Sequence, residues 1–402
     1  MEIRQLTSDD RENFARMMRY AFEPARNTYD GAVKEDWEVS QPHLKDMSEC
    51  YGCFDGETMV SVSAFFESVV IIRNKEIPFG GVWGVATSPH YRNRGLIRLI
   101  FKRMLEEMSL KGIPFSILYP FKFSFYEQFG YKMANEINRY QIDVNEIITR
   151  PVSDRNVREV FSLEDIKLIY SEIAGKSYNY MVKRTEEDWR RRINRERPGY
   201  FFVCYDDNKK PKGYLIAQFQ EREAQDFEKS EETIYLPEIF WTDSKTRQAL
   251  FNFLRDHKDH RRYVLFGSPD PCMLSYVENP RVKQTDIFAG SMARIVNVKD
   301  VLEGFDYPSE EDVSFVIQVK DSFCDWNNSS FSFSLDGGKA TIAKTSKPAD
   351  VHIEIGALTQ MIVGYRTASQ LYDSWEIEAS PQLRQTLDGL FPNQNNFFRD
   401  FF

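Results

Sequence analysis

A strand, a basic loop and a helix follow one another in VWGVATSPHYRNRGLIRLIFKRML, residues 82–105. The β-rich run ends at Thr87, and the segment from Arg92 to Gly95 leads into the helix. The first N–H groups of a helix lack partners within it, and the helix dipole favours an anion there. Arginines add charge-assisted hydrogen bonds, and a glycine lets the backbone approach a ligand closely. This spacing indicates a pyrophosphate site, although the residues alone also fit an ordinary basic loop before a surface helix.

The elements around this motif alternate between strand and helix. Residues 51–87 are rich in β-forming residues, with a hairpin signal at Asp55-Gly56 and a turn at 73–75. An amphipathic helix is expected from about Gly95 to Gly112, because its apolar residues recur at helical spacing. The other elements expected here are a helix over 8–22, a strand over 114–121, a short helix within 123–131 and a last strand over 139–144.

Two further regions follow. Residues 145–160 are expected to form a linker, and 199–269 read as a hairpin followed by strand, helix and strand. The element order of the second region echoes the first, which indicates a duplicated domain. From about residue 290 the pattern changes to antiparallel strands with single helices. We expect three domains, at residues 1–148, 149–289 and 290–402.

Composition supports several domains and excludes some classes of protein. At about 150 residues per domain, 402 residues suggest two or three domains. The formal charge of −9 argues against a nucleic-acid partner, is compatible with cationic substrates, and fits equally a role in solubility alone. The five cysteines are scattered and predict no disulfide framework. With no signal peptide and no apolar run of about 20 residues, we expect a cytoplasmic protein without a membrane partner.

The motif V-A-T-x-P-x-Y-R-x-R-G-L, followed by FYEQFGY at 125–131, resembles the GNAT N-acetyltransferase family. In that family the loop holds the pyrophosphate of acetyl-CoA, and the preceding strand binds the pantetheine through its backbone. The resemblance therefore implies acetyl-CoA as co-substrate. Ile97 departs from the usual pattern, in which a glycine or alanine allows close packing under the pyrophosphate. The residues implied in coenzyme binding are Val85, Ala86, Thr87, Arg92, Asn93, Arg94, Gly95 and Leu96.

The whole chain resembles the Eis (enhanced intracellular survival) acetyltransferases. That group has an α/β (α+β) fold with two tandem GNAT-like mixed-sheet domains, the second degenerate, followed by a sterol-carrier-like domain. The form of the loop from Arg92 to Arg98 also fits this group. The resemblance implies an N-acetyltransferase that assembles as a homo-oligomer, a hexamer. Its acceptor is expected to be a primary amine on a cationic small molecule, such as an aminoglycoside, or a lysine side chain.

Tyr126 is the candidate general acid. Acetylating an amine requires a neutral nucleophile, stabilisation of the oxyanion and a proton for the leaving thiolate. A phenol with a pKa of about 10 can protonate a thiolate whose own pKa is about 8.5. The resemblance gives a tyrosine at this position that role, whereas the residues alone also allow Tyr126 to serve in packing.

The C-terminal carboxylate of Phe402 is the candidate base, as the resemblance implies. Desolvation among the aromatic side chains of NNFFRDFF would raise the pKa of that carboxylate. The alternative is a frayed tail. We expect the tail to contribute little to the core of either neighbouring domain. His257 and His260 suggest a solvated helix face, so no metal site is expected.

The acceptor pocket is indicated only by an acidic segment with one tryptophan. Carboxylates and an indole face could hold a polyamine, although a solvated acidic loop fits equally. The candidate residues are Asp30, Glu35, Asp36 and Trp37. Two other functions remain open: transfer of a different acyl group, as in the N-myristoyltransferases, and non-catalytic lipid binding by the C-terminal domain.

Overall fold

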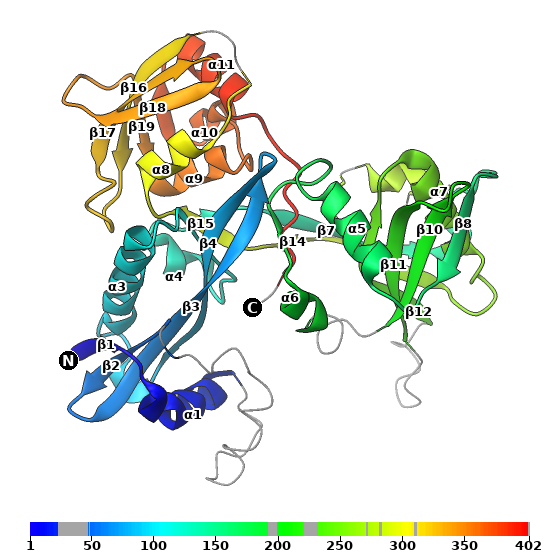
Figure 1. Ribbon diagram of the computed structural model, residues 1–402, viewed down its shortest axis with the longest axis horizontal. Coiled ribbons are helices and arrows are strands. Elements are labelled where there is room, and N and C mark those ends of the chain that lie inside the picture. Colours follow the sequence, from blue (N-terminus) through cyan, green and yellow to red (C-terminus); the bar gives the residue numbers. More distant parts are fainter. Residues whose placement is uncertain are drawn as a thin grey trace.

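The computed structural model describes residues 1–22, 47, 49–191, 199–220, 232–270, 272–280, 284–308 and 312–400. Three bodies, each built on its own β-sheet, meet at a central junction (Figure 1). Each sheet contains one parallel pair among antiparallel ones, so the predicted mixed α/β fold is confirmed.

The first sheet has the order β1-β2-β3-β4-β5-β15-β6, with β9 beside β3. Successive residues of a strand face opposite sides of a sheet. A Cβ on Gly80 would meet Met108 of α3 (Leu96–Leu110), whereas Trp83 packs against Phe14 of α1 (Arg11–Phe22), so α1 and α3 cover opposite faces. The strands are β1 (Glu2–Gln5), β2 (Cys50–Asp55), β3 (Thr58–Ile72), β4 (Lys75–Thr87), β5 (Phe115–Leu118), β6 (Lys132–Met133), β9 (Met181–Val182) and β15 (Met292–Ile295).

The second sheet has the order β14-β7-β13-β12-β11-β10-β8. Its strands are β7 (Glu136–Asp143), β8 (Arg155–Glu159), β10 (Tyr200–Asp206), β11 (Pro211–Gln220), β12 (Thr233–Trp241), β13 (Tyr263–Ser268) and β14 (Gln284–Ala289). Its helices are α5 (Glu164–Ile173), α6 (Glu186–Arg191) and α7 (Ser244–Arg255).

Sheet membership departs from sequence order at both ends of the second body. The strand expected to end the first domain, β7, pairs with β13 and β14 in the second sheet. Conversely, β15 returns to the first sheet, where it pairs with β5 and β6. Ile142 of β7 and Met292 of β15 lie in the cores of the sheets that their strands join. The first two bodies are therefore interlocked by an exchange of strands.

The third body has a sheet of order β18-β17-β16-β19-β20. Its strands are β16 (Val313–Lys320), β17 (Ser329–Asp336), β18 (Lys339–Lys344), β19 (Val351–Glu354) and β20 (Ile377–Ala379). Its helices are α8 (Val298–Gly304), α9 (Ile355–Ile362), α10 (Ala368–Asp373) and α11 (Pro381–Leu390).

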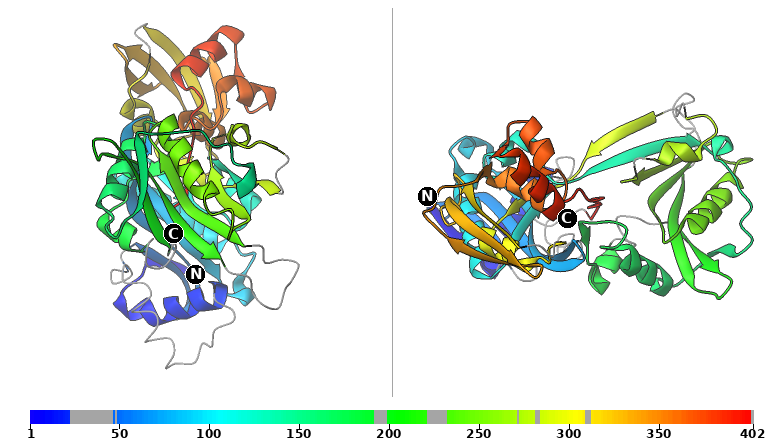
Figure 2. Two further views of the ribbon diagram at one scale, coloured as in Figure 1. Left: turned by 90° about the vertical axis from the view of Figure 1, so that its right-hand side faces the viewer. Right: turned by 90° about the horizontal axis from the view of Figure 1, so that it is seen from above.

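One continuous core joins the third body to the first. Phe79 and Phe115 of the first sheet share an apolar cluster with Leu358 and Phe391 of the third body. The right-hand view in Figure 2 shows these two bodies packed together and the second body set to one side. Beyond α11 the chain runs back to the junction, so the C-terminal segment lies between the bodies (Figure 1).

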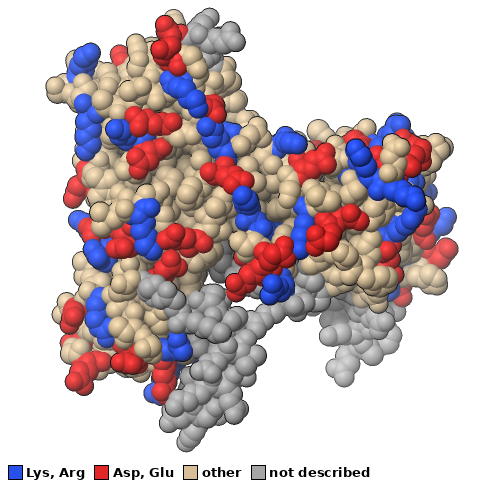
Figure 3. Space-filling view, viewed as in Figure 1, with Lys and Arg blue, Asp and Glu red and all other residues tan. Residues whose placement is uncertain are grey.

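Positive and negative side chains are interspersed across the face seen in Figure 3. All five cysteines are free thiols. Among the described helices, none combines the length and the apolar character needed to cross a membrane.

Candidate functional site

The two central strands of the first sheet diverge at their C-terminal ends. The parallel pairing of β4 with β5 runs from Phe79 opposite Phe115 to Val82 opposite Leu118, where β5 ends. Within the described residues, β4 continues to Thr87 with only β3 as its partner. The other edge of residues 83–87 can therefore bind a ligand through backbone groups, and the candidates Val85, Ala86 and Thr87 lie on this edge.

A β-bulge bends β4 where the strands diverge. The register with β3 shifts between Val62 and Ala64, and Gly84 has a φ of +64°. Glycine adopts this left-handed conformation without strain, and a bulge re-aims the residues that follow it. The bulge therefore directs the last residues of β4 toward the basic loop.

The basic loop is fastened to the sheet at its base and exposed at its tip. The Tyr91 hydroxyl donates a hydrogen bond to Asp55 at 2.9 Å, which ties the loop to the β2–β3 hairpin. Arg92 donates from Nε to the Thr87 carbonyl at 3.3 Å, and the Arg94 guanidinium lies 4.9 Å from the Tyr91 ring centroid. Arg92, Asn93, Arg94 and Gly95 are all exposed. Two cations are thus held at the surface beside the start of α3.

The start of α3 is open to an anion. Gly95 is the N-cap residue, has a φ of +74° and provides no side-chain cap. Leu96 and Ile97, the first two helical residues, are buried in the apolar cluster beneath the helix. Ile97 therefore points into the core, and its departure from the usual pattern puts no side chain on the outer surface of the loop.

Tyr126 lies in α4 (Phe123–Glu127) and belongs to the same apolar cluster as Leu96. Its side chain is buried, and burial raises the pKa of its phenol. The structure thus brings Tyr126 and the loop-bearing helix together through shared packing. The rings around Tyr126 are those of Phe101, Phe121, Phe125 and Tyr131, with centroids 5.1 to 6.3 Å away.

The other candidate site residues lie outside the described residues. These are Phe402 and the acidic segment with Asp30, Glu35, Asp36 and Trp37. No group of three or more His, Cys, Asp or Glu side chains among the described residues could hold a metal ion.

The tail leading to Phe402 is described as far as Asp400, and it is part of the core. Phe398 is fully buried, and its carbonyl accepts hydrogen bonds from Tyr119 at 3.2 Å and Asn135 at 3.0 Å. The expectation that the tail contributes little to either core is wrong for this segment. Ring centroids 5.0 to 5.9 Å apart link Phe398 to Phe79, Tyr119 and Tyr180, and Phe397 to Tyr178 and Phe240.

Sequence reasoning missed the polar groups that hold this tail. Asn179 receives the backbone N–H of Phe397 at 2.8 Å and donates from its amide to Asn396 at 2.7 Å. Arg184 binds Asp400 at 2.8 Å between Nε and Oδ1. Both Asn179 and Arg184 are more than 200 residues from their partners in sequence, so no local pattern could reveal these contacts.

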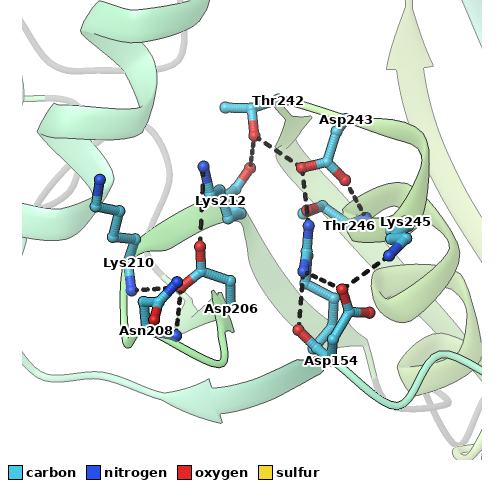
Figure 4. A network of polar contacts seen from close by, with 10 residues as sticks. Asp154, Asp206, Asn208, Lys210, Lys212, Thr242, Asp243, Lys245 and Thr246 are labelled. Carbon is cyan, nitrogen blue, oxygen red and sulfur yellow. Dashed lines mark hydrogen bonds and ion pairs between the residues drawn. The ribbon is translucent and has the colours of Figure 1, made fainter.

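Among its described residues, the second sheet carries no equivalent of the basic loop. Its α7 begins directly after β12, and the side chain of Asp243 caps it by accepting from the Thr246 N–H at 2.8 Å. Arg155 in turn binds Asp243 at 3.2 Å, and Figure 4 shows the side chain of Asp243 facing Thr246. Burial opposes the charge of Asp243, but the bonds from Thr246 and Arg155 lower the pKa of its carboxyl. A carboxylate therefore already stands where an incoming anion would bind, which is consistent with the degenerate second domain expected from the sequence.

Comparison with protein families identifies all three bodies. An acetyltransferase (GNAT) domain model matches residues 2–134, a second GNAT domain model matches 181–295, and a sterol carrier protein domain model matches 298–399. The protein is an acyltransferase of the GNAT class, whose co-substrate is acetyl-CoA. More particularly, its domain order, two GNAT domains followed by a sterol carrier protein domain, is the three-domain architecture expected from the sequence.

Known relatives support this identification. The chain is 23% identical to an uncharacterized N-acetyltransferase of Streptomyces coelicolor, over 77% of each chain, and 23% identical to one of Streptomyces avermitilis, over 82% of each. A probable N-acyltransferase of Enterococcus faecalis has the same fold, with a TM-score of 0.85 at 23% identity over 100% of this chain and 99% of that one. Eis1 from Mycobacterium abscessus superposes with a TM-score of 0.79 at 21% identity over 99% of each chain.

Proposed function

We propose that this protein transfers the acetyl group of acetyl-CoA to a primary amine of a cationic small molecule or a lysine. The observation that carries the proposal is the open N-terminus of α3, with Arg92 and Arg94 exposed beside it and Tyr126 packed under the same helix. Within the part of the chain that the structure describes, the first of the two GNAT domains has this combination and the second does not. The negative charge of the chain, −9, supports a cationic acceptor.

The proposed chemistry uses groups of the first domain. The loop and the α3 N–H groups hold the pyrophosphate, and the free edge of β4 binds the pantetheine amides. The acceptor nitrogen attacks the acetyl carbonyl carbon, a C–N bond forms and the C–S bond breaks. Tyr126 gives its proton to the departing thiolate, and the proton lost by the nitrogen passes to the carboxylate of Phe402.

The remaining parts of the proposal concern the acceptor and the assembly. Asp30, Glu35, Asp36 and Trp37 would bind the acceptor as carboxylate partners and an aromatic face. The protein would act in the cytoplasm as a homo-oligomer, for which the Eis architecture suggests a hexamer. These parts rest on sequence and resemblance.

The test is a screen of amines against acyl-CoA donors of increasing length, with free thiol release as readout. Aminoglycosides, polyamines and a lysine peptide serve as acceptors, and acetyl-CoA, a medium-chain acyl-CoA and myristoyl-CoA serve as donors. We expect turnover with acetyl-CoA and at least one polycationic amine. Turnover only with long-chain donors would show that the protein transfers a longer acyl group and not acetyl. No amine-dependent release from any donor would contradict the proposal.

A further inference from the structure

The loop between β16 and β17, residues 321–328, reaches from the third body into the first. Phe323 of this loop lies in the apolar cluster beneath α3, together with Leu96 and Tyr126. The ring centroids of Phe323 and Phe129, which follows α4, are 5.1 Å apart. Figure 1 shows the third body next to α3 and α4. The third body therefore supplies part of the core on which the candidate site is built.

The same loop is tied to the chain that leaves β15. Trp326 and Asn327 both donate to the carbonyl of Val296, at 2.8 and 3.0 Å. The side-chain oxygen of Asn327 accepts the backbone N–H of Val298 at 3.0 Å. Asn327 also donates to Asp321 at 3.1 Å. These bonds fix the first residue of the loop, Asp321, relative to the end of β15.

A buried ion pair joins the loop to β15. Arg294 donates from Nη2 to Oδ2 of Asp321 at 2.5 Å, and the two side chains are 0% and 1% exposed. The other oxygen of Asp321, Oδ1, accepts the backbone N–H groups of Phe323 and Cys324, each at 3.0 Å. The carboxylate is therefore held by its own loop as well as by the arginine.

The remaining donors of Arg294 reach the turn that follows α4. Its Nη1 donates to the carbonyl of Phe129, and its Nε donates to the carbonyl of Ile295 at 3.2 Å. The N–H of Phe129 in turn donates to the carbonyl of Tyr126 at 2.9 Å. A continuous series of hydrogen bonds thus runs from Asp321 of the third body, through Arg294 and Phe129, to the last turn of the helix that carries Tyr126.

A glycine makes room for the arginine at this turn. Gly130 has a φ of +81°, and a Cβ on it would lie 3.0 Å from Nη1 of Arg294 and 2.8 Å from Cγ2 of Ile355. Glycine adopts this conformation without strain and lets the guanidinium approach the backbone closely. The glycine of FYEQFGY therefore has a local reason that the sequence pattern alone does not show: it admits a side chain from β15.

The ion pair is better suited to fixing a position than to adding stability. Burying two charges costs much of the attraction between them, so such pairs contribute little net stability. Their geometry is nevertheless specific, because a guanidinium presents its donors in a rigid plane. One planar group that binds Asp321 and the Phe129 carbonyl together sets the distance between the loop and the turn.

We propose that Arg294 is a positioning residue, held in place by Asp321 of the third body, which fixes the turn after α4 and thereby the side chain of Tyr126 for acetyl transfer. The proposal rests on the proposed function, because it requires Tyr126 to serve as the general acid. It also assigns a task to the sterol-carrier-like domain, which supports the acid of the first domain.

The main test is Arg294→Lys, made in the wild-type protein and in Tyr126→Phe. Lysine keeps the positive charge for Asp321 but lacks the planar donors that also reach Phe129. Misplacement of a reacting group by about 1 Å can cost up to 10²-fold in rate, so we expect kcat to fall about tenfold while KM for acetyl-CoA stays within about twofold. In Tyr126→Phe the same change should alter kcat by less than about twofold, because the group that it positions is already gone.

A second variant covers the case in which Arg294→Lys does not fold. The double change Arg294→Met, Asp321→Asn removes both buried charges, and asparagine can still accept the N–H groups of Phe323 and Cys324. We expect the same loss of kcat as in Arg294→Lys. Arg155→Lys is the matched control, because Arg155 is also nearly buried, at 10% exposed, and binds Asp243, but lies in the second body. It should leave kcat unchanged even where it lowers the thermal midpoint.

Hydrogen exchange of the peptide that spans residues 121–133 measures the turn directly. Both Arg294 variants should exchange faster there than the wild-type protein, because the turn has lost its buried donor. Unchanged exchange would overturn the anchor. Faster exchange with unchanged kcat, or an equal loss of kcat with and without the Tyr126 hydroxyl, would overturn the positioning role. If the wild-type protein shows no acetyl transfer, the proposed function fails and the positioning role fails with it, whereas exchange still decides whether Arg294 holds the turn.

Discussion

Tyr126 keeps its proton because its ring is enclosed by four other aromatic rings. Burial raises the pKa of the phenol above its ordinary value of 10. The phenol therefore stays protonated across the physiological range, as the proposed role of Tyr126 as proton donor requires. In the proposed reaction the thiolate forms beside Tyr126, where desolvation raises its proton affinity as well, since desolvation disfavours any anion. The proton transfer from phenol to thiolate thus remains feasible.

We expect Tyr126→Phe to lower kcat by about 10²- to 10⁴-fold with little change in acetyl-CoA affinity, because it removes the proton and little volume. Thiol release under saturating substrate and calorimetric titration with acetyl-CoA measure the two effects. Tyr131→Phe is the control: its hydroxyl is bound to Ser116 at 2.7 Å, so its loss should affect stability and leave kcat within about threefold. Near-normal turnover of Tyr126→Phe would make Tyr126 a packing residue.

The pH dependence of kcat provides a second test of Tyr126. A raised pKa means that the neutral phenol persists beyond the pH at which an exposed tyrosine ionises. We therefore expect no loss of kcat from this residue between about pH 8 and pH 10. A profile of kcat with saturating acceptor measures this. A falling limb with a midpoint near or below pH 9 that disappears in Tyr126→Phe would contradict the buried environment.

At the scale of elements, the two GNAT sheets differ at the start of one helix. The N-terminus of α3 is uncapped and carries two exposed arginines, whereas that of α7 is capped by Asp243. An open N-terminus attracts an anion and a carboxylate cap repels one. The difference in coenzyme binding that we propose between the domains thus depends on a few residues rather than on the fold.

The double variant Arg92→Ala, Arg94→Ala should weaken acetyl-CoA binding at least tenfold. Each charge-assisted hydrogen bond contributes about 1–3 kcal/mol, and both side chains are exposed, so we take the low end of this range. Isothermal titration calorimetry measures the affinity. Arg103→Ala is the matched control, because Arg103 lies on α3 itself, beyond the loop, and pairs with Glu107. Unchanged affinity in the folded double variant would refute the role of this loop.

The sequence predicted the elements that carry the motifs better than it predicted which strands and residues they contact. The helix after Gly95 and the exposed loop follow from local spacing, and so does the placement of Tyr126 on a short helix. In contrast, the exchange of β7 and β15 between sheets could not be predicted, because an alternating strand pattern does not specify which distant edge it will join. The Arg184–Asp400 contact was hidden for the same reason, as it links residues far apart in the chain.

At the scale of the molecule, the three bodies converge on the C-terminus. The shared core of the first and third bodies holds Phe398, and the second body holds Phe397 and Asp400. Deleting several terminal residues would remove buried rings worth about 1.5–3 kcal/mol each, and would confuse a catalytic role with a structural one. Changes beyond Asp400 are therefore the cleaner way to test the carboxylate.

Appending four residues after Phe402 should suppress kcat at least tenfold while leaving the thermal midpoint within about 3 °C. The extension moves the carboxylate and places a neutral amide at its former position, whereas the buried segment through Asp400 is unchanged. Thiol release and calorimetric unfolding are measured on the same preparation. The control carries the same four residues at the N-terminus and should retain full activity.

A C-terminal amide made by semisynthesis removes only the charge, so it should lower kcat without moving any side chain. If the extended protein keeps full activity and an ordinary thermal midpoint, the carboxylate is not the base, and the proton acceptor must be sought among the carboxylates of the first domain.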